Sequence, residues 1–122
     1  MCAIALSVLL SLLSQGVFAW PIGPCALLAV MNTSAYTDAS GDGLGLTASG
    51  ERTQRGTMAA GSSIPFNTQT LVPGYGSGHV ADRGREIGNG HIDLWVQDED
   101  EAWEWGRRSL PVIFFWGDNR GE

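Results

Sequence analysis

Two aspartates, Asp82 and Asp93, are the residues of this sequence that are best placed for acid–base chemistry. Asp82 ends one short apolar run, Asp93 lies inside the next, and the connection between them contains three glycines. A connection of this kind can bring two carboxylates to the same rim of a barrel. In the run His91–Trp95, strand alternation places Asp93 on one face together with His91 and Trp95.

An aspartate that lies among aromatic side chains and close to a second carboxylate can act as a proton donor. Burial among aromatic side chains raises the pKa of an aspartate, and a second carboxylate nearby raises it further. A protonated aspartic acid near neutral pH is the group that a glycosidic leaving oxygen needs. The alternative is structural, because aspartates beside glycines usually cap turns and a strand aspartate often holds a loop as a hydrogen-bond acceptor. Spacing alone favours that structural alternative.

Other residue patterns point less clearly to chemistry. Asp38 and Asp42 lack the ligand spacing of a calcium loop, and no helix opens after the glycine-rich run 74–78 to hold a phosphate. His79 and His91 have no third partner for a metal. We therefore expect neither a metal nor a cofactor. The five tryptophans mostly suit a core, although Trp95 at the rim could stack on a sugar ring.

Charge composition narrows the class of partner. The formal net charge is −6, and all seven basic residues are arginines. The absence of lysine excludes Schiff-base chemistry and the phosphate-binding lysine of nucleotide-binding loops. Nucleic acid requires a basic face, which an acidic chain with scattered arginines does not provide. A neutral or mixed-charge polymer such as a polysaccharide is the expected partner, and we expect the protein to be a monomer.

The first nineteen residues have the pattern of a secretory signal. Ala3–Val17 is mostly apolar, and Val17-Phe18-Ala19 offers a cleavage site before Trp20. Residues 1–19 are therefore expected to be removed, leaving a domain of residues 20–122 that is exported to the periplasm, outer membrane, cell wall or medium, or carried on a phage particle. The n-region lacks Lys and Arg, so an uncleaved anchor or an imprecise start remain alternatives. The run is too short to span a bilayer comfortably.

Removal of residues 1–19 would also change the cysteine count. Cys2 would be lost with the signal, leaving Cys25 without an internal disulfide partner. We expect Cys25 to be a small buried apolar residue.

Short apolar runs between glycines predict a small closed β-barrel with one helix. Seventeen glycines supply tight turns and close backbone approaches. The helix begins after Asp98, which can cap it, and ends at Gly106. The expected strands are Ala26–Tyr36, Gly56–Ala60, Gln69–Val72, His79–Asp82, His91–Trp95 and Leu110–Trp116.

From about Thr33 to Phe115 the chain resembles the 3D domain, a family of bacterial and phage cell-wall proteins named for three aspartates. The resemblance is carried by Ala35-Tyr36-Thr37, Gly45–Gly50, Met58–Ala60, Ile64–Thr68, Pro73–Gly76, Asp82-x-Gly84, His91–Leu94 and Trp105–Arg107. The order of these segments is the same as in the family. The resemblance implies a six-stranded double-psi β-barrel, shared with lytic transglycosylases of the MltA type and more distantly with expansins.

The resemblance also implies roles for individual residues. Asp93 matches the catalytic acid of the transglycosylases, and Asp82 matches the aspartate that supports it. Asp93 would protonate the glycosidic oxygen between MurNAc and GlcNAc in peptidoglycan, then take a proton from the C6 hydroxyl that forms a 1,6-anhydro product. Thr37, Tyr75 and Trp95 are the expected substrate-binding residues, and no cofactor is implied.

Two positions depart from the family pattern, and they keep other functions open. Gly61 stands where the first of the three aspartates is expected, and Arg83 follows Asp82 where threonine is common. A non-catalytic, expansin-like module that binds or loosens cell-wall polysaccharide is the main alternative. A plain glycoside hydrolase is the other, with water in place of the C6 hydroxyl.

Overall fold

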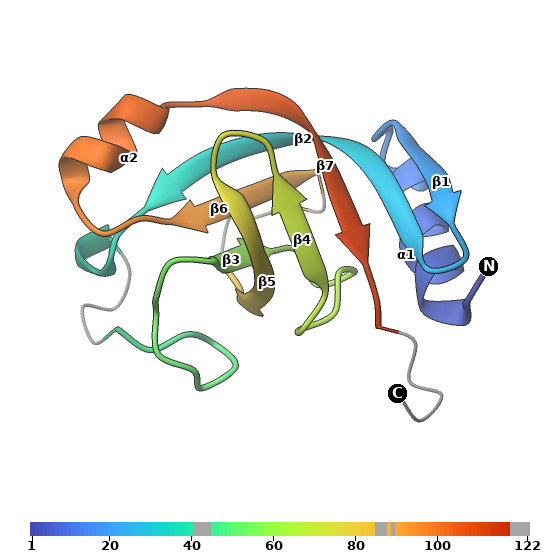
Figure 1. Ribbon diagram of the computed structural model, residues 1–122, viewed down its shortest axis with the longest axis horizontal. Coiled ribbons are helices and arrows are strands. Elements are labelled where there is room, and N and C mark those ends of the chain that lie inside the picture. Colours follow the sequence, from blue (N-terminus) through green and yellow to red (C-terminus); the bar gives the residue numbers. More distant parts are fainter. Residues whose placement is uncertain (41–44, 85–87, 89, 118–122) are drawn as a thin grey trace.

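The computed structural model describes residues 1–40, 45–84, 88, 90–117, and within them seven strands form one sheet that closes on itself (Figure 1). The strand order is β1-β2-β6-β3-β5-β4-β7, and a further pairing of β2 with β7 completes the circle. The elements are α1 (Ala3–Ser14), β1 (Ala19–Gly23), β2 (Ala26–Tyr36), the 3₁₀ turn η1 (Asp38–Ser40), β3 (Thr57–Ala60), β4 (Gln69–Val72), β5 (Gly76–Asp82), β6 (His91–Trp95), α2 (Glu99–Trp105) and β7 (Arg108–Phe115).

The predicted fold class is confirmed, because six of these strands make a closed barrel and β1 is an addition to it. β2 is the longest strand, and it pairs antiparallel with β7 along most of its length. Its second half pairs in parallel with β6, and β3 pairs in parallel with β5. Closure removes the free edges that an open sheet of this size would expose.

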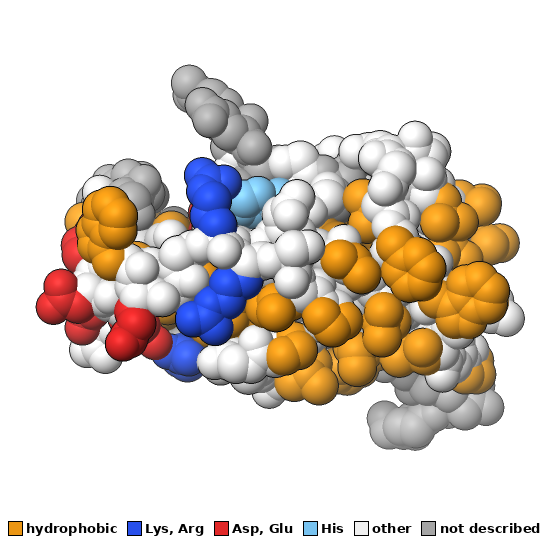
Figure 2. Space-filling view, turned by 90° about the horizontal axis from the view of Figure 1, so that it is seen from above, with side chains coloured by type: hydrophobic (Ala, Val, Ile, Leu, Met, Phe, Trp, Pro, Cys, Tyr) orange, Lys and Arg blue, Asp and Glu red, His pale blue; other side chains and the backbone are white. Residues whose placement is uncertain are grey.

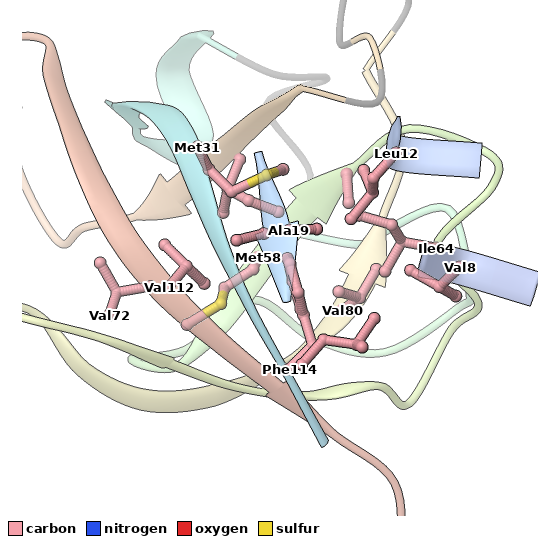
Figure 3. Close-up of a cluster of buried hydrophobic side chains, with 14 of the residues drawn as sticks. Val8, Leu12, Ala19, Met31, Met58, Ile64, Val72, Val80, Val112 and Phe114 are labelled. Carbon is pink, nitrogen blue, oxygen red and sulfur yellow. The ribbon is translucent and has the colours of Figure 1, made fainter. Parts of the chain in front are cut away.

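Alternation along the strands decides which side chains fill the barrel (Figure 3). On β2, the side chains of Leu27, Ala29 and Met31 are buried, and the residues between them face outward. Ile92 and Leu94 of β6 are fully buried in the same way. Apolar burial of this kind stabilises a fold by about 25 cal/mol per Å². The same alternation turns residues 91, 93 and 95 away from the core, which places Asp93 on the outer face of the barrel.

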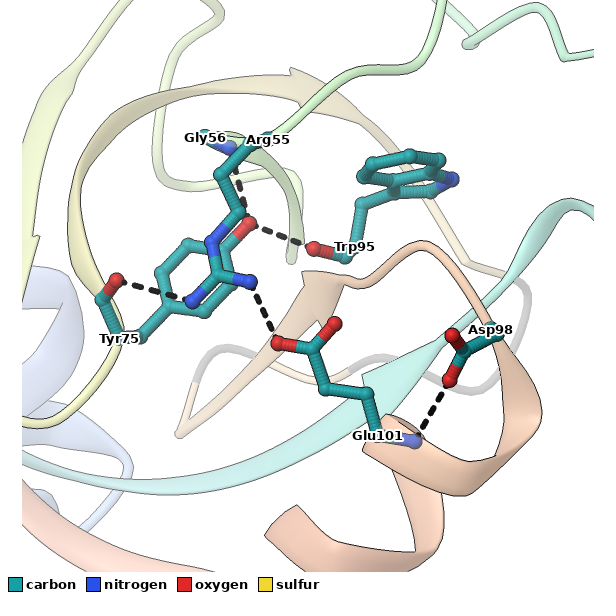
Figure 4. Close-up of polar contacts among 6 residues, drawn as sticks. All are labelled: Arg55, Gly56, Tyr75, Trp95, Asp98 and Glu101. Atoms are coloured by element: carbon teal, nitrogen blue, oxygen red, sulfur yellow. Dashed lines mark hydrogen bonds and ion pairs between the residues drawn. The ribbon is translucent and has the colours of Figure 1, made fainter.

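The helix α2 forms as its sequence predicts. The side chain of Asp98 accepts a 2.9 Å hydrogen bond from the N–H of Glu101, and the helix ends at Gly106 with a φ of 64°. Arg55 forms an ion pair with Glu101 and lies over the ring of Tyr75, which ties α2 to the segment before β3 (Figure 4).

The N-terminal segment differs from the expectation of a single helix. Residues 3–14 form α1, in which Ala5, Val8 and Leu12 are buried. Cys2 forms a disulfide with Cys25 in the chain that carries residues 1–19. The expectation of an unpartnered Cys25 concerns the chain after removal of that segment, and it stays a prediction. That expectation followed from removing Cys2 with the signal. Cleavage after residue 19 stays a prediction.

Apolar and acidic side chains gather on opposite ends of one face of the molecule (Figure 2). The apolar end contains exposed residues of the β1 region, among them Phe18, Trp20 and Ile22. Acidic side chains gather at the α2 end, where Glu99, Asp100 and Glu101 form the first helical turn. In the part of the chain that the structure describes, neither helix has the length and apolar character needed to cross a bilayer.

Candidate functional site

Asp82 and Asp93 reach the same cavity because both are register partners of one residue, Ala59. Strand β3 lies between β5 and β6, and Ala59 pairs with Asp82 on one side and with Asp93 on the other. A shift of register between Met58 and Ala59 adjusts the β3–β5 ladder at this point. Both aspartates line a cavity of about 370 Å³. The shared rim that the sequence predicts for them is therefore present.

Four further polar side chains line this cavity around the two acids. Ser34 and Tyr36 come from β2, Arg83 follows β5, and Arg107 precedes β7. None of the four was predicted as a catalytic or binding residue. A local signal existed for Ser34 and Tyr36, since both alternate with buried residues of β2, but only the pairing of β2 with β6 brings them to Asp93.

Asp93 has the electrostatic environment of a general acid. Burial raises its pKa above the ordinary value, and the negative charge of Asp82 adds to the rise. A hydrogen bond of 3.0 Å from the Ser34 hydroxyl and the positive fields of His91 and Arg107 act in the opposite direction. Desolvation is the largest of these effects, so the net pKa is raised. An acid with a raised pKa keeps its proton closer to neutral pH, where it can donate it.

Asp82 is held as a hydrogen-bond acceptor. Its Oδ1 accepts 2.9 Å hydrogen bonds from the backbone N–H groups of Ala48 and Arg83. Its Oδ2 accepts a 2.9 Å hydrogen bond from the hydroxyl of Tyr36. Ala48 belongs to the Gly45–Gly50 turn, so this turn positions a carboxylate from a strand far away in the sequence. The two aspartates therefore have different environments, since three donors converge on Asp82 and Asp93 is partly desolvated.

Tyr36 and Arg83 are themselves fixed in place. Burial raises the pKa of the Tyr36 hydroxyl, and the charge of Asp82 adds to it, so Tyr36 remains a donor at ordinary pH. The guanidinium of Arg83 donates a 2.7 Å hydrogen bond to the carbonyl of Ile64 and lies 4.2 Å from the ring centroid of Phe66. Burial lowers the pKa of Arg83. This anchoring keeps the Arg83 side chain beside the cavity.

A second cavity of about 290 Å³ shares Asp82 with the first. Tyr36, Asp82 and Arg83 line both cavities, and Thr37 lines the second. Thr37 is only 3% exposed, and its hydroxyl donates a 2.7 Å hydrogen bond to Glu99. The predicted substrate-binding Thr37 thus lies near the acids, with its side chain joined to α2.

The structure does not bring the other two predicted substrate-binding residues, Tyr75 and Trp95, into either cavity. The Tyr75 hydroxyl accepts a hydrogen bond from the N–H of Gly56 and donates one of 2.6 Å to the carbonyl of Trp95 (Figure 4). The indole N–H of Trp95 donates to Asp38 at 2.9 Å. Both side chains hold neighbouring loops together by these contacts.

Candidate metal ligands do not assemble in the described part of the chain. No group of three or more His, Cys, Asp and Glu side chains that could hold an ion occurs among the described residues. Asp42, one of the two acids that faintly resemble a calcium loop, lies outside them. His79 contacts Glu51 at 2.8 Å, whereas His91 contacts Ser34 at 2.7 Å. The two histidines therefore have different partners.

Comparison with known proteins gives one informative similarity. No protein-family model matches the chain. The chain is 30% identical, over 87 residues, to the cell wall-binding protein YocH of Bacillus subtilis. The matched region is 67% of this chain and 30% of that relative. The chain therefore spans about 30% of the length of the relative it matches.

Proposed function

We propose that this chain is an exported cell-wall protein that binds peptidoglycan or a related polysaccharide and cleaves it as a lytic transglycosylase. The observation that carries this proposal is the pairing of two unlike carboxyl groups in one open cavity. Asp93 has a raised pKa, whereas three donors converge on Asp82. Division of labour between two carboxyl groups is the general scheme of glycosidic bond cleavage. The similarity to a cell wall-binding protein supports the same class of polymer.

The proposed reaction uses Asp93 twice. Its carboxylic acid gives a proton to the oxygen between MurNAc and GlcNAc as the bond from that oxygen to C1 breaks. The resulting carboxylate then takes the proton of the MurNAc C6 hydroxyl, whose oxygen forms a new bond to C1. The product is a 1,6-anhydro sugar, and Asp93 ends with the proton that it began with. Asp82, held as an acceptor, stabilises the positive charge that develops near C1.

The shape of the site supports binding of a chain-like substrate. Two cavities meet at Asp82, so sugars on both sides of the cleaved bond have space in the same groove. Thr37 in the second cavity is the proposed substrate-binding residue that lies closest to this path. We propose that Tyr75 and Trp95 act indirectly, because their polar atoms hold the loops around Gly56 and Asp38.

A digest of purified peptidoglycan tests the proposal, with mass spectrometry of the products. Anhydro-MurNAc products from the unaltered protein, and none from Asp93→Asn, would support it. Asp100→Asn is the matched control, because Asp100 is an exposed acid of α2 outside both cavities. Products without the anhydro ring would indicate a hydrolase, in which water replaces the C6 hydroxyl.

A non-catalytic, expansin-like binding module is the second candidate. The relative is named for cell-wall binding, and Gly61 stands where the resembling family has its first aspartate. Retention of the protein on peptidoglycan, with no soluble products at any pH, would favour this candidate. Asp93→Asn should then be retained on peptidoglycan to the same extent, because binding alone does not need the acid.

A further inference from the structure

A third residue, Ser34, joins Asp93 to His91. The Ser34 hydroxyl oxygen lies 3.0 Å from Oδ1 of Asp93 and 2.7 Å from Nε2 of His91. The parallel pairing of β2 with β6 sets this arrangement, because Ser34 is the register partner of Asp93. His91 precedes Asp93 by two residues on β6, so both side chains leave the same face of the strand.

A serine hydroxyl has one proton, which limits the ways in which these contacts can be made. When Asp93 is a carboxylate, Ser34 donates to it and His91 donates its Nε2–H to the Ser34 oxygen. When Asp93 is protonated, its O–H donates to Ser34, and Ser34 donates to an unprotonated Nε2. The two arrangements differ only in the position of protons along one line of hydrogen bonds.

The ends of this line open into different cavities. Asp93 and Ser34 line the cavity that also contains Asp82. His91 lines a separate cavity of about 240 Å³, which Asn32, Thr33 and Ser109 also line. Arg107 lies between the two and borders both. A glycan in the groove beside Asp82 would cover Asp93 and leave the cavity at His91 open to water.

We propose that Ser34 and His91 form a proton relay that supplies, from the His91 cavity, the proton with which Asp93 begins the reaction. The inference rests on the proposed role of Asp93 as the acid. An imidazolium at His91 gives its Nε2 proton to the Ser34 oxygen as Ser34 passes its own proton to the Asp93 carboxylate. His91 becomes neutral, Asp93 becomes a carboxylic acid, and the hydroxyl of Ser34 is restored. The proton that His91 loses is replaced from water in its own cavity.

Burial is the main effect that favours this exchange. The groups that act on Asp93 are Asp82 at the end of β5, Tyr36 on β2, His91 on β6 and Arg107 before β7. Those that act on His91 are Asp93 and Arg107. Burial raises the pKa of Asp93 and lowers the pKa of His91, and Arg107 lowers the latter further. Two groups whose pKa values approach each other can exchange a proton at small energetic cost.

A double-mutant cycle on peptidoglycan cleavage tests the relay. In both Ser34→Ala and His91→Gln, the rate of cleavage measured across the pH range should fall about tenfold. This size is expected for coupled residues in one network. The double variant should lose no more than either single variant. Ser34→Thr should recover the rate, because it keeps the hydroxyl. Ser77→Ala, an exposed serine of β5 that lines none of these cavities, is the control and should match the unaltered protein. Losses that multiply in the double variant would overturn the relay.

NMR titration of the His91 ring tests the same connection without requiring cleavage. In the unaltered protein the His91 signals should follow two steps, one of them shared with Asp93. Asp93→Asn should lower the pKa of His91 and remove the shared step, and Ser34→Ala should weaken that step. His79, the other histidine, is the internal reference. A His91 titration unchanged in Ser34→Ala would overturn the relay. Absence of cleavage with a coupled titration would instead reject only the transglycosylase proposal.

Discussion

The hydroxyl of Tyr36 donates a 2.9 Å hydrogen bond to Oδ2 of Asp82 and joins the end of β2 to the end of β5. The two residues are 46 positions apart, and they line both cavities of the candidate site. Burial and the charge of Asp82 raise the pKa of Tyr36, so this donor keeps its proton over the whole pH range of the proposed cleavage.

Tyr36→Phe should therefore lower the stability of the protein and the rate of cleavage. The pH dependence of that rate in the alkaline range should not change. Loss of one hydrogen bond to an acceptor of this kind should lower the free energy of unfolding by about 1–2 kcal/mol. Urea denaturation measures that change, and the rate of peptidoglycan cleavage should fall with it. Tyr75→Phe should destabilise by a similar amount and leave the pH–rate profile unchanged, because Tyr75 lines neither cavity. A rate of cleavage that is equal in Tyr36→Phe and the unaltered protein would contradict a role for Tyr36 in the site.

Asp93→Asn should abolish cleavage and leave the fold intact. The folded-state pKa of Asp93 lies above its ordinary value of 3.8. The folded state therefore binds more protons than the unfolded state between those two pKa values, and stability falls as pH rises through that window. Asn carries no titrating proton, so the variant should lack this fall and be at least as stable at neutral pH. Denaturation curves measured from pH 3 to pH 8 check the result, and an unfolded variant would show that Asp93 is structural.

Asp82→Asn should lower activity less than Asp93→Asn does. It should also shift the pH range over which Asp93 acts as an acid. The charge of Asp82 raises the pKa of Asp93, so its removal should lower that pKa. The alkaline limb of the pH–rate profile, where Asp93 loses its proton, should then shift toward lower pH. An amide keeps one oxygen that accepts from the N–H groups of Ala48 and Arg83, and its NH2 group can donate to the Tyr36 hydroxyl oxygen, which limits the structural damage. An unchanged profile would show that the two aspartates are not coupled.

The fate of residues 1–19 decides the state of Cys25. If the segment is a cleaved signal, the exported protein should begin at or near Trp20 by N-terminal sequencing, and Cys25 should react with a thiol reagent. If the segment is retained, α1 should stay packed and the Cys2–Cys25 disulfide should close its loop. Reduction should then lower the stability of the full chain by about 3 kcal/mol, the usual effect for a loop of this length. Detection of Met1 on the exported protein would reject cleavage.

Local sequence signals predicted several elements with their observed bounds. The strands Ala26–Tyr36, Gln69–Val72 and His91–Trp95 and the cap at Asp98 appear as expected, because alternation and capping act over a few neighbouring residues. The elements α1, β1 and η1 were missed. β1 lies in a short segment whose partner is the first half of β2, and α1 lies in a run that resembles a signal.

The sequence by itself determined that Asp93 leaves the strand on the face opposite Ile92 and Leu94, since a strand alternates every residue. It also predicted that Asp82 and Asp93 share a rim, because a short glycine-containing connection joins their strands. Only the tertiary structure decided that Ser34 lies against Asp93, Tyr36 against Asp82 and Ala59 between the two acids. Those contacts depend on the register of strands far apart in the chain, and register is set when the barrel closes around its buried side chains.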